Sequence, residues 1–284
     1  MPELPEVENI KMGLKPNVID KKILDIEFSD VVINSHSSGR SAVVKDNLKY
    51  FKDNLVGKSI LDLERRGKYV YFTLDKGYMI THFGMTGAYF VVNNLDEIDN
   101  KNYHKHRHVI FKLDSGELMV YSDIRRFGEL RYIEDIADFK PFISLAPEPF
   151  KKDALSYFLE KLESKKYANQ KIKGLLLEGN VFCGCGNIYA CEILYQEKIN
   201  PERLASELSV KEKKKLFNAL VKMLEFSIEQ GGSTISDYVH ADGGEGNMQN
   251  FHKIYGKKEC PLGHEVENIV IKTRSTHYCP KCQK

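Results

Sequence analysis

Hydrophobic and polar residues alternate with a period of two through much of the first half of the chain. The pattern runs from Lys22 to about Ile133, and Val70, Phe72 and Leu74 form one clear stretch of it, with Gly, Asp and Asn residues between stretches. Successive side chains of a strand point to opposite faces, so this alternation is typical of half-buried strands. The sequence therefore predicts an antiparallel β-sandwich or barrel here.

A helix is predicted ahead of the strands. Val7, Ile10 and Leu14 recur at helical spacing, and Pro5 precedes them. Proline is tolerated in the first turn of a helix, where its missing N–H would have no intrahelical partner. We therefore expect a helix that begins within the first five residues.

The second half of the chain has helical periodicity. Residues 138–150 hold three prolines and are the expected linker. Ser209 and Glu212 have the spacing of a capping box that opens a long amphipathic helix, and this helix should stop at Gly231-Gly232. Asn187 is the expected cap of a shorter helix.

Composition narrows the class of protein. The chain has 284 residues, of which 42% are hydrophobic and 29% charged, which excludes a disordered or collagen-like protein. No stretch approaches the roughly 18 apolar residues of a membrane span. The first ten residues, MPELPEVENI, lack the basic and apolar regions of a signal peptide. We therefore expect a cytoplasmic protein without a membrane partner.

Charge and cysteines draw attention to the carboxyl end. The net charge is +2 overall, but residues 251–284 hold seven basic and three acidic side chains. Cys260, His264, Cys279 and Cys282 are spaced as two short knuckles that supply four ligands. Three thiolates and one imidazole suit one tetrahedral, structural zinc ion. The alternatives are surface thiols beside a coincidental histidine, or His277 as the nitrogen ligand.

The amino terminus is a candidate reagent. Removal of Met1 before the small residue Pro2 would expose a secondary amine at the start of a helix. An α-amine is far less basic than a lysine, so it can act as a nucleophile near neutral pH. Glu3 adjoins it, and Glu6 lies one helical turn further on, where both can serve acid–base chemistry. The alternative is that these residues only favour a helix start.

Seven motifs, in order along the whole chain, resemble those of the formamidopyrimidine-DNA glycosylase family. They are MPELPE at 1–6, RRGK at 65–68, HFGMTG at 82–87, DIRRFG at 123–128, GNIYA at 186–190, EQGGST at 229–234 and RSTHYCPKC at 274–282. The resemblance implies an α+β, multidomain fold. Its parts are an N-terminal antiparallel β-sandwich flanked by helices (1–137), the linker (138–150), a helix-two-turn-helix domain (151–240), and a lesion loop with a zinc-finger β-hairpin (241–284).

By this resemblance, the chain is a bacterial, monomeric base-excision-repair enzyme. Its partner would be double-stranded DNA that contains oxidised bases or abasic sites. The Pro2 amine would attack C1′ of a flipped-out nucleotide, with Glu3 as general acid, Glu6 assisting and Lys68 in the catalytic set. Successive β- and δ-elimination would then cut the strand.

The resemblance also assigns DNA contacts. Met85, Arg125 and Phe127 would fill the space left by the flipped base, although Met85 and Phe127 could instead be core residues of a sheet. Phosphate contacts fall to Lys68, His82, Asn187 and Arg274. Lys68 and Arg274 could otherwise be ordinary solvent-exposed charges.

The sequence also bears on substrate preference, the zinc ligands, the remaining cysteines and the competing functions. The glycine-rich segment 238–251 lies where family members carry a loop over 8-oxoguanine, which favours oxidised purines over the oxidised pyrimidines of the Nei branch. Gly263 stands where the family usually has a zinc-binding cysteine. Cys183, Cys185 and Cys191 are expected to be small buried residues, or else a redox-sensitive group. Competing functions are a non-catalytic damaged-DNA-binding protein and a zinc-ribbon RNA- or ribosome-associated protein.

Overall fold

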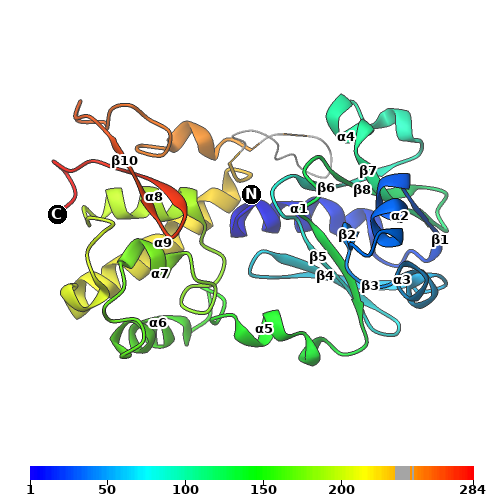
Figure 1. The fold of residues 1–284 in the computed structure, drawn as a ribbon, viewed down its shortest axis with the longest axis horizontal. Coiled ribbons are helices and arrows are strands. Elements are labelled where there is room, and N and C mark those ends of the chain that lie inside the picture. The colour runs from blue at the N-terminus through cyan, green and yellow to red at the C-terminus, as the bar shows by residue number, and fades with distance from the viewer. Residues whose placement is uncertain (234–243, 245) are drawn as a thin grey trace. The chain divides into compact units, whose positions relative to one another are not determined.

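The computed structural model describes residues 1–233, 244 and 246–284, and the chain folds into two compact units. The first unit comprises Met1–Ile143 and Gln230–Asn247, and the second comprises Ser144–Glu229 and Met248–Lys284 (Figure 1). The division falls inside the segment expected to be a linker, where a short helix, α5 (Lys140–Ser144), is also present.

The first unit contains two sheets and several helices. One sheet has four strands in the order β1-β7-β8-β6, and the other has five in the order β2-β9-β5-β4-β3. The helices are α1 (Leu4–Val18), α2 (Asp30–Ser37), α3 (Leu48–Leu55) and α4 (Lys101–Lys105). The strands are β1 (Ile23–Phe28), β2 (Val43–Val44), β3 (Ile60–Arg66), β4 (Tyr69–Leu74), β5 (Tyr78–His82), β6 (Gly87–Val92), β7 (Arg107–Leu113), β8 (Leu118–Asp123) and β9 (Glu129–Ile133).

The predicted sandwich and first helix are confirmed. Phe72 of one sheet and Phe111 of the other belong to a single buried cluster. Val7, Ile10 and Leu14 of α1 are buried in the same cluster, so this helix closes the core of the sandwich. The burial of one face of α1 therefore fixes the start of the chain firmly against the sheets.

Two features of this unit depart from simple antiparallel alternation. The short strand β2 pairs with β9 in parallel, whereas the other sheet pairs are antiparallel. Alternation reports which face of a strand is buried but not the direction of its neighbour. Helices α2 and α3 also interrupt the strand pattern, because Ser29 and Asn47 cap them with side-chain oxygens that accept backbone N–H groups.

The second unit is mainly helical and ends in a hairpin. Its elements are α6 (Ala154–Glu163), α7 (Ile172–Leu176), α8 (Asn187–Gln196), α9 (Val210–Glu229), β10 (Glu267–Ile271) and β11 (Arg274–Tyr278). Phe158, Phe182 and Phe217 form an aromatic core, with ring centroids 5.4–6.0 Å apart. The predicted capping box of α9 is confirmed: the Ser209 N–H donates to Glu212, and the Glu212 N–H donates to the Ser209 hydroxyl.

The prediction that Asn187 caps α8 is wrong. The cap residue is Gly186, and Asn187 is the first residue of the helix itself. Its side chain does not turn back to the helix N–H groups, because other partners hold it, as described below. Asparagine is a common cap, but the sequence cannot show which tertiary contacts compete for its amide.

The two strands of the hairpin turn at Lys272 and Thr273. Both have positive φ values, 47° and 62°, as a two-residue hairpin turn of the right twist requires. The ammonium of Lys272 donates to the carboxamide oxygen of Gln170 at 2.9 Å and also pairs with Glu178. These contacts outside the hairpin offset the cost of a left-handed backbone at residues other than glycine.

Candidate functional site

Three residues near the amino terminus, at the start of α1, are buried. Pro2 is buried, and Glu3 and Glu6 are only 3% and 2% exposed. One carboxylate oxygen of Glu6 accepts the N–H of Glu3 at 2.8 Å, and the other accepts the N–H of Ser233 at 2.7 Å. The structure therefore brings Pro2, Glu3 and Glu6 together, with Glu6 held by a backbone hydrogen bond on each oxygen.

The partner of Glu6 comes from the far end of the sequence. Gly232 has a φ of 78°, a backbone conformation that favours glycine, and a Cβ built on it would lie 3.1 Å from Glu6 Cγ. Ser233 follows and is 4% exposed. The sequence marks this glycine pair as a helix end and as part of the EQGGST motif, but it gives no signal of the contact with Glu6, because residues more than 220 positions apart share no local pattern.

Lys68 lies in the turn between β3 and β4, and His82 is the last residue of β5 in the same five-stranded sheet. Tyr69, next to Lys68, is paired with His82, and their rings are 4.7 Å apart. Burial, reinforced by the positive charge of Lys68, lowers the pKa of His82 to about 4. The Gly84 N–H donates to Nδ1 of His82 at 3.2 Å. His82 is therefore neutral near pH 7, and its Nε2–H is the group that can donate to a ligand.

Residues 123–128 form a loop that is organised by a buried carboxylate. Asp123 is fully buried, and its two oxygens accept the Thr86 hydroxyl at 2.5 Å and the Gly128 N–H at 2.7 Å. The Thr86 hydroxyl in turn accepts the Arg125 N–H at 2.9 Å. This network ties the loop that carries Met85 to the loop that carries Arg125 and Phe127.

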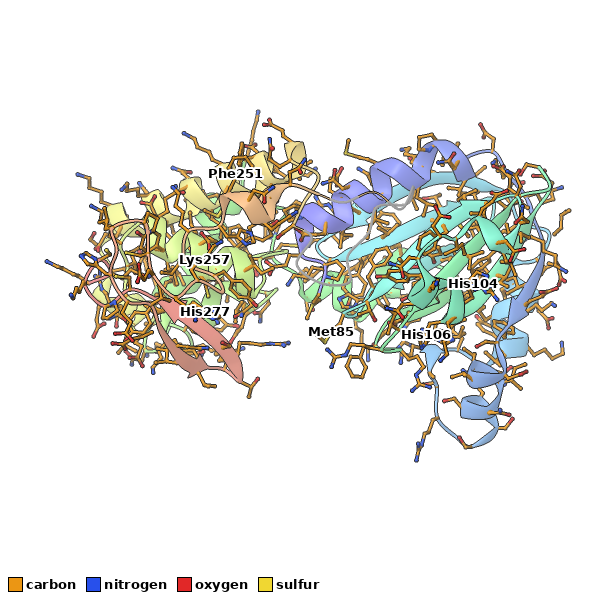
Figure 2. The ribbon with its side chains drawn as sticks, turned by 90° about the horizontal axis from the view of Figure 1, so that it is seen from above. Met85, His104, His106, Phe251, Lys257 and His277 are labelled. Atoms are coloured by element: carbon orange, nitrogen blue, oxygen red, sulfur yellow. The ribbon has the colours of Figure 1, made fainter. Side chains whose placement is uncertain are left out.

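The tips of both loops reach solvent. The Phe127 side chain is 56% exposed, and the guanidinium of Arg125 lies 4.9 Å from the centre of its ring. Met85, labelled in Figure 2, is partly exposed in the loop between β5 and β6. The alternative that Phe127 is a sheet-core residue is therefore excluded. Asp123 and Thr86 were not singled out from the sequence, although both lie inside motifs that were.

In the second unit, Asn187 connects α8 with the hairpin. Its amide nitrogen donates to the carbonyl of Ser275 at 2.8 Å, and its carbonyl accepts the ammonium of Lys173 at 2.5 Å. Arg274 precedes Ser275 and is exposed. The structure therefore places Asn187 and Arg274 side by side, and it adds the fully buried Lys173, which the sequence gave no signal to find.

Three thiols and one imidazole gather at the carboxyl end. The possible ligand atoms of Cys260, His264, Cys279 and Cys282 all lie within 4.8 Å of one another. Nδ1 of His264 is 3.3 Å from the Cys282 sulfur and 3.8 Å from the Cys279 sulfur. Four such atoms at these separations fit a tetrahedral metal ion. The residues therefore form a group that could hold one.

His277, the alternative nitrogen ligand, does not belong to this group. Its ring packs against Tyr255 at a centroid distance of 5.0 Å (Figure 2 labels it on the hairpin). Its Nδ1 is buried without a hydrogen-bond partner among the described residues. Gly263 has a φ of 74°, so the position where the family usually has cysteine instead turns the chain and presents His264.

The other three cysteines are buried, as expected. Cys183, Cys185 and Cys191 are between 1% and 2% exposed. The Cys183 thiol is 3.5 Å from a carboxylate oxygen of Glu148, and the Cys185 thiol is 3.5 Å from the carbonyl of Gly186. Cys191 packs in the same cluster as Cys260 and Cys279. Their burial favours the interpretation as small core residues.

Among the residues that the structure describes, no helix has the length and apolarity to cross a membrane.

Family models cover most of the chain. Residues 1–130 match the formamidopyrimidine-DNA glycosylase N-terminal domain, and residues 145–239 match the formamidopyrimidine-DNA glycosylase H2TH domain. A formamidopyrimidine-DNA glycosylase of Streptococcus mutans is 36% identical over 290 aligned residues, which cover 100% of both proteins. One from Bacillus cereus is 35% identical and is matched over 100% of this chain and 99% of its own length.

Solved structures agree with the sequence relatives. The Lactococcus lactis Fpg in complex with DNA containing an abasic site has a TM-score of 0.83 and 32% identity, covering 100% of both chains. MutM in complex with DNA containing carbocyclic 8-oxo-G has a TM-score of 0.85 and 33% identity, with the same coverage. The chain therefore belongs to the formamidopyrimidine-DNA glycosylase family.

Proposed function

We propose that this protein is a bifunctional DNA glycosylase and abasic-site lyase that removes oxidised purines from double-stranded DNA. The observation that carries the proposal is the buried cluster of Pro2, Glu3 and Glu6 at the start of α1. A full-length relationship to formamidopyrimidine-DNA glycosylases supports it. Burial of two carboxylates beside the amino-terminal amine favours a catalytic role for them over a role in helix stability alone.

The proposed reaction begins when Met1 is removed and the Pro2 nitrogen becomes a free secondary amine. Its lone pair attacks C1′ of the damaged nucleotide, and the bond between C1′ and the base breaks. Glu3, as general acid, protonates the sugar-ring oxygen as the ring opens, which leaves a Schiff base between Pro2 and the sugar. Loss of a proton from C2′ expels the 3′ phosphate, and a second elimination expels the 5′ phosphate.

Glu6 is better suited to positioning than to proton transfer. Each of its oxygens already accepts a backbone N–H, one from Glu3 and one from Ser233. It therefore fixes the backbone of the proposed general acid and joins it to residues 231–233. Such rigid support is what a catalytic group needs, because small displacements of reacting groups are costly.

Four residues are proposed to hold phosphates. Lys68 and Arg274 supply positive charge, and the family resemblance also places Lys68 in the catalytic set. His82 is neutral, so it contacts a phosphate as a hydrogen-bond donor and not as a charge. Asn187 opens α8, where backbone N–H groups also favour an anion.

Met85, Arg125 and Phe127 are proposed to fill the stack when the damaged nucleotide is flipped out. The exposure of Phe127 and its contact with Arg125 support this, because a side chain that inserts between bases must project out of the protein core. The guanidinium can hydrogen-bond to the orphaned base. Flipping costs a few kcal/mol, and these contacts offset part of that cost.

One zinc ion is proposed at Cys260, His264, Cys279 and Cys282. Three thiolates and an imidazole form a closed set that leaves no position for substrate, so the ion would be structural. It would hold the hairpin that carries Arg274 and has little core of its own.

Oxidised purines are the proposed substrates, and oxidised pyrimidines are the alternative. Relatives named Fpg or MutM have been crystallised with Fapy-dG, with carbocyclic 8-oxo-G and also with an oxidised pyrimidine. Half of the segment 238–251, on which the preference for purines was first based, falls on residues 238–243 and 245, outside the described part of the chain. We further propose a monomeric enzyme that works on the chromosome in the bacterial cytoplasm.

One experiment tests this function. The protein is incubated with duplexes bearing 8-oxoguanine, formamidopyrimidine, thymine glycol or an abasic site, and adducts are trapped with borohydride. We expect the fastest cleavage at oxidised purines, phosphates at both new ends, and a reduced adduct that mass spectrometry places on the Pro2 nitrogen. Faster cleavage at thymine glycol would favour the Nei branch. Binding without an adduct would indicate a non-catalytic binder, and an adduct on an internal lysine would overturn the mechanism.

A further inference from the structure

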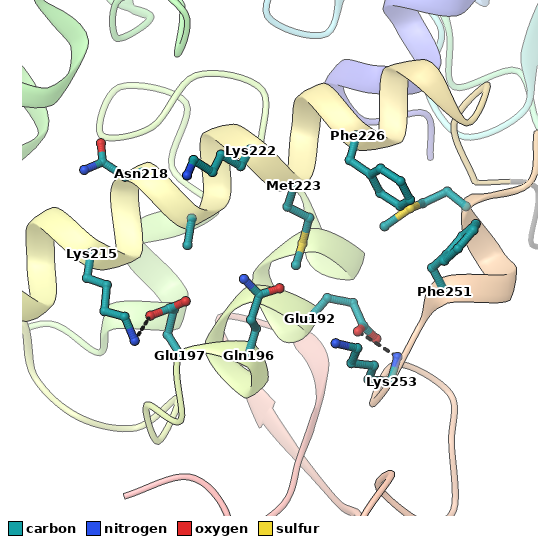
Figure 3. A pocket seen from close by; sticks show the side chains of 12 residues that line it. Glu192, Gln196, Glu197, Lys215, Asn218, Lys222, Met223, Phe226, Phe251 and Lys253 are labelled. Carbon is teal, nitrogen blue, oxygen red and sulfur yellow. Dashed lines mark hydrogen bonds and ion pairs between the residues drawn. The ribbon is translucent and has the colours of Figure 1, made fainter.

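A groove of about 540 Å³ lies in the second unit, between α8, α9 and residues 248–253. One face of α9, from Lys215 to Phe226, forms its long wall (Figure 3). The eleven residue-to-residue steps from Lys215 to Phe226 rise about 16 Å along the helix, so the groove is elongated. None of its lining residues belongs to the proposed catalytic, phosphate-binding or metal-binding sets, and two of them, Met248 and Phe251, lie at the end of the glycine-rich segment 238–251.

The groove has one apolar end. Phe226 and Phe251 are 37% and 46% exposed, and their rings meet edge to face with centroids 5.0 Å apart. Met223 and Met248 line the groove beside them (Figure 3 labels Met223). Two aromatic rings and two flexible thioethers make a surface that adapts to an incoming apolar side chain. Exposed aromatic residues of this kind are enriched at protein interfaces.

Charges along the groove are unbalanced in favour of cations. Both acidic residues of the lining have partners of their own. A carboxylate oxygen of Glu197 lies 2.9 Å from the ammonium nitrogen of Lys215. Glu192 accepts the N–H groups of residues 253, 254 and 255 at 2.7–3.0 Å. Lys222 and Lys253 line the same groove and form no ion pair within the described part of the chain. An occupant that matches this lining therefore carries carboxylates.

Glu192 also gives the groove a fixed shape. Its side chain is 3% exposed, and its three hydrogen bonds hold the backbone that follows Phe251 and His252. The wall formed by residues 251–253 is therefore tied to α8. A preformed wall reduces the ordering cost of binding.

We propose that this groove binds an acidic peptide segment of a partner protein. An aromatic side chain of the segment packs on Phe226, Phe251 and Met223, and neighbouring carboxylates pair with Lys222 and Lys253. About five extended residues match the length of the groove at roughly 3.3 Å each. The groove continues from this apolar end along α9 to Lys215, so it has room for a peptide, whereas a small aromatic acid would occupy only one end.

The test uses a fluorescein-labelled octapeptide with two adjacent phenylalanines and three aspartates on each side. Fluorescence polarisation is measured with the zinc-loaded, full-length protein. We expect saturable binding with a dissociation constant below about 1 mM. A peptide with asparagine for aspartate, or serine for phenylalanine, should bind about tenfold more weakly. Phe226→Ala and Lys222→Glu should each weaken binding of the original peptide about tenfold.

Lys214→Glu is the matched control, because Lys214 is exposed on the same helix and does not line the groove. It should leave peptide affinity unchanged, and all three variants should cleave lesion-containing DNA at the normal rate. Absence of saturation, or equal loss in Lys214→Glu and Lys222→Glu, overturns the proposal. Equal affinity for 3-phenylpropionate would indicate a small-molecule site instead. Displacement of the peptide by undamaged duplex would make the groove part of the DNA surface.

Discussion

The Thr86 hydroxyl donates a hydrogen bond of 2.5 Å to the buried carboxylate of Asp123 and accepts one from the N–H of Arg125. This single hydroxyl therefore joins two loops that are distant in sequence, one carrying Met85 and the other carrying Arg125 and Phe127. If these three residues enter the DNA stack together, the hydrogen bonds of Thr86 help to hold them in a single relative arrangement.

Replacement of Thr86 tests that relationship. Thr86→Val keeps the shape but removes one hydrogen bond to Asp123 and the nearer acceptor of the Arg125 N–H, which retains only its 3.2 Å hydrogen bond to Asp123. It should therefore lower the free energy of unfolding by about 1–3 kcal/mol. It should also weaken binding to a duplex with an abasic-site analogue. Thr86→Ser keeps the hydroxyl and is the control. Urea unfolding and polarisation titrations measure both effects, and equal behaviour of the two variants would contradict the assignment.

Two glycine substitutions distinguish the effect of the Gly232–Glu6 contact from the effect of backbone strain. Gly232→Ala places a Cβ 3.1 Å from Glu6 at a φ of 78°, whereas Gly39→Ala meets nothing within 4 Å at a φ of 74°. Both should cost about 1–2 kcal/mol of stability. Only Gly232→Ala should slow strand cleavage, by about tenfold or more, because it displaces Glu6. Equal cleavage rates in single-turnover assays would show that Glu6 does not position the site.

The pH dependence of stability follows from His82. Its pKa is about 4 in the folded protein, against 6.5 for an ordinary histidine, so the unfolded chain binds a proton more readily. Stability from the neutral ring is present above pH 6.5 and is lost as the pH falls toward 4. The loss should amount to about 3 kcal/mol once the pH is below both values. His82→Gln should remove this part of the pH dependence, and the exposed-site control His104→Gln should retain it in urea unfolding curves.

Salt dependence distinguishes the proposed phosphate contacts. Lys68→Gln and Arg274→Gln should each reduce the slope of log K against log salt by about 0.9, because one counterion fewer is released. His82→Gln should weaken binding at every salt concentration without changing the slope, since this ring is neutral. Polarisation titrations with an abasic-analogue duplex measure the slopes. A slope change for His82→Gln would mean that DNA binding protonates the ring.

Metal content decides between the two candidate histidines. His264→Asn should lose about one equivalent of zinc and should expose the hairpin to proteolysis, because the ion replaces a core there. His277 lies on the hairpin but is not among the four candidate ligands, so the His277→Asn protein should keep its zinc. Elemental analysis and limited proteolysis give the readout. Metal loss in His277→Asn alone would reverse the assignment.

Several elements could be predicted because their signals are local. The burial of Val7, Ile10 and Leu14, the capping box of α9 and the cysteine knuckles each depend on spacing within one short segment. Prediction was weaker where two local choices compete. The sequence favours Asn187 as a helix cap, but Lys173 and Ser275 hold its side chain instead.

The sequence by itself determined the strand and helix periodicities, the four metal-binding residue types and the amine-and-carboxylate pattern of the first six residues. These depend on residue spacing, which the chain carries before it folds. Only the tertiary structure decided which groups meet: Glu6 with Ser233, Asp123 with Thr86, and Lys272 with Gln170. Such pairs form because burial of the whole core brings distant backbone segments together, and buried polar groups then take whichever partners lie within reach.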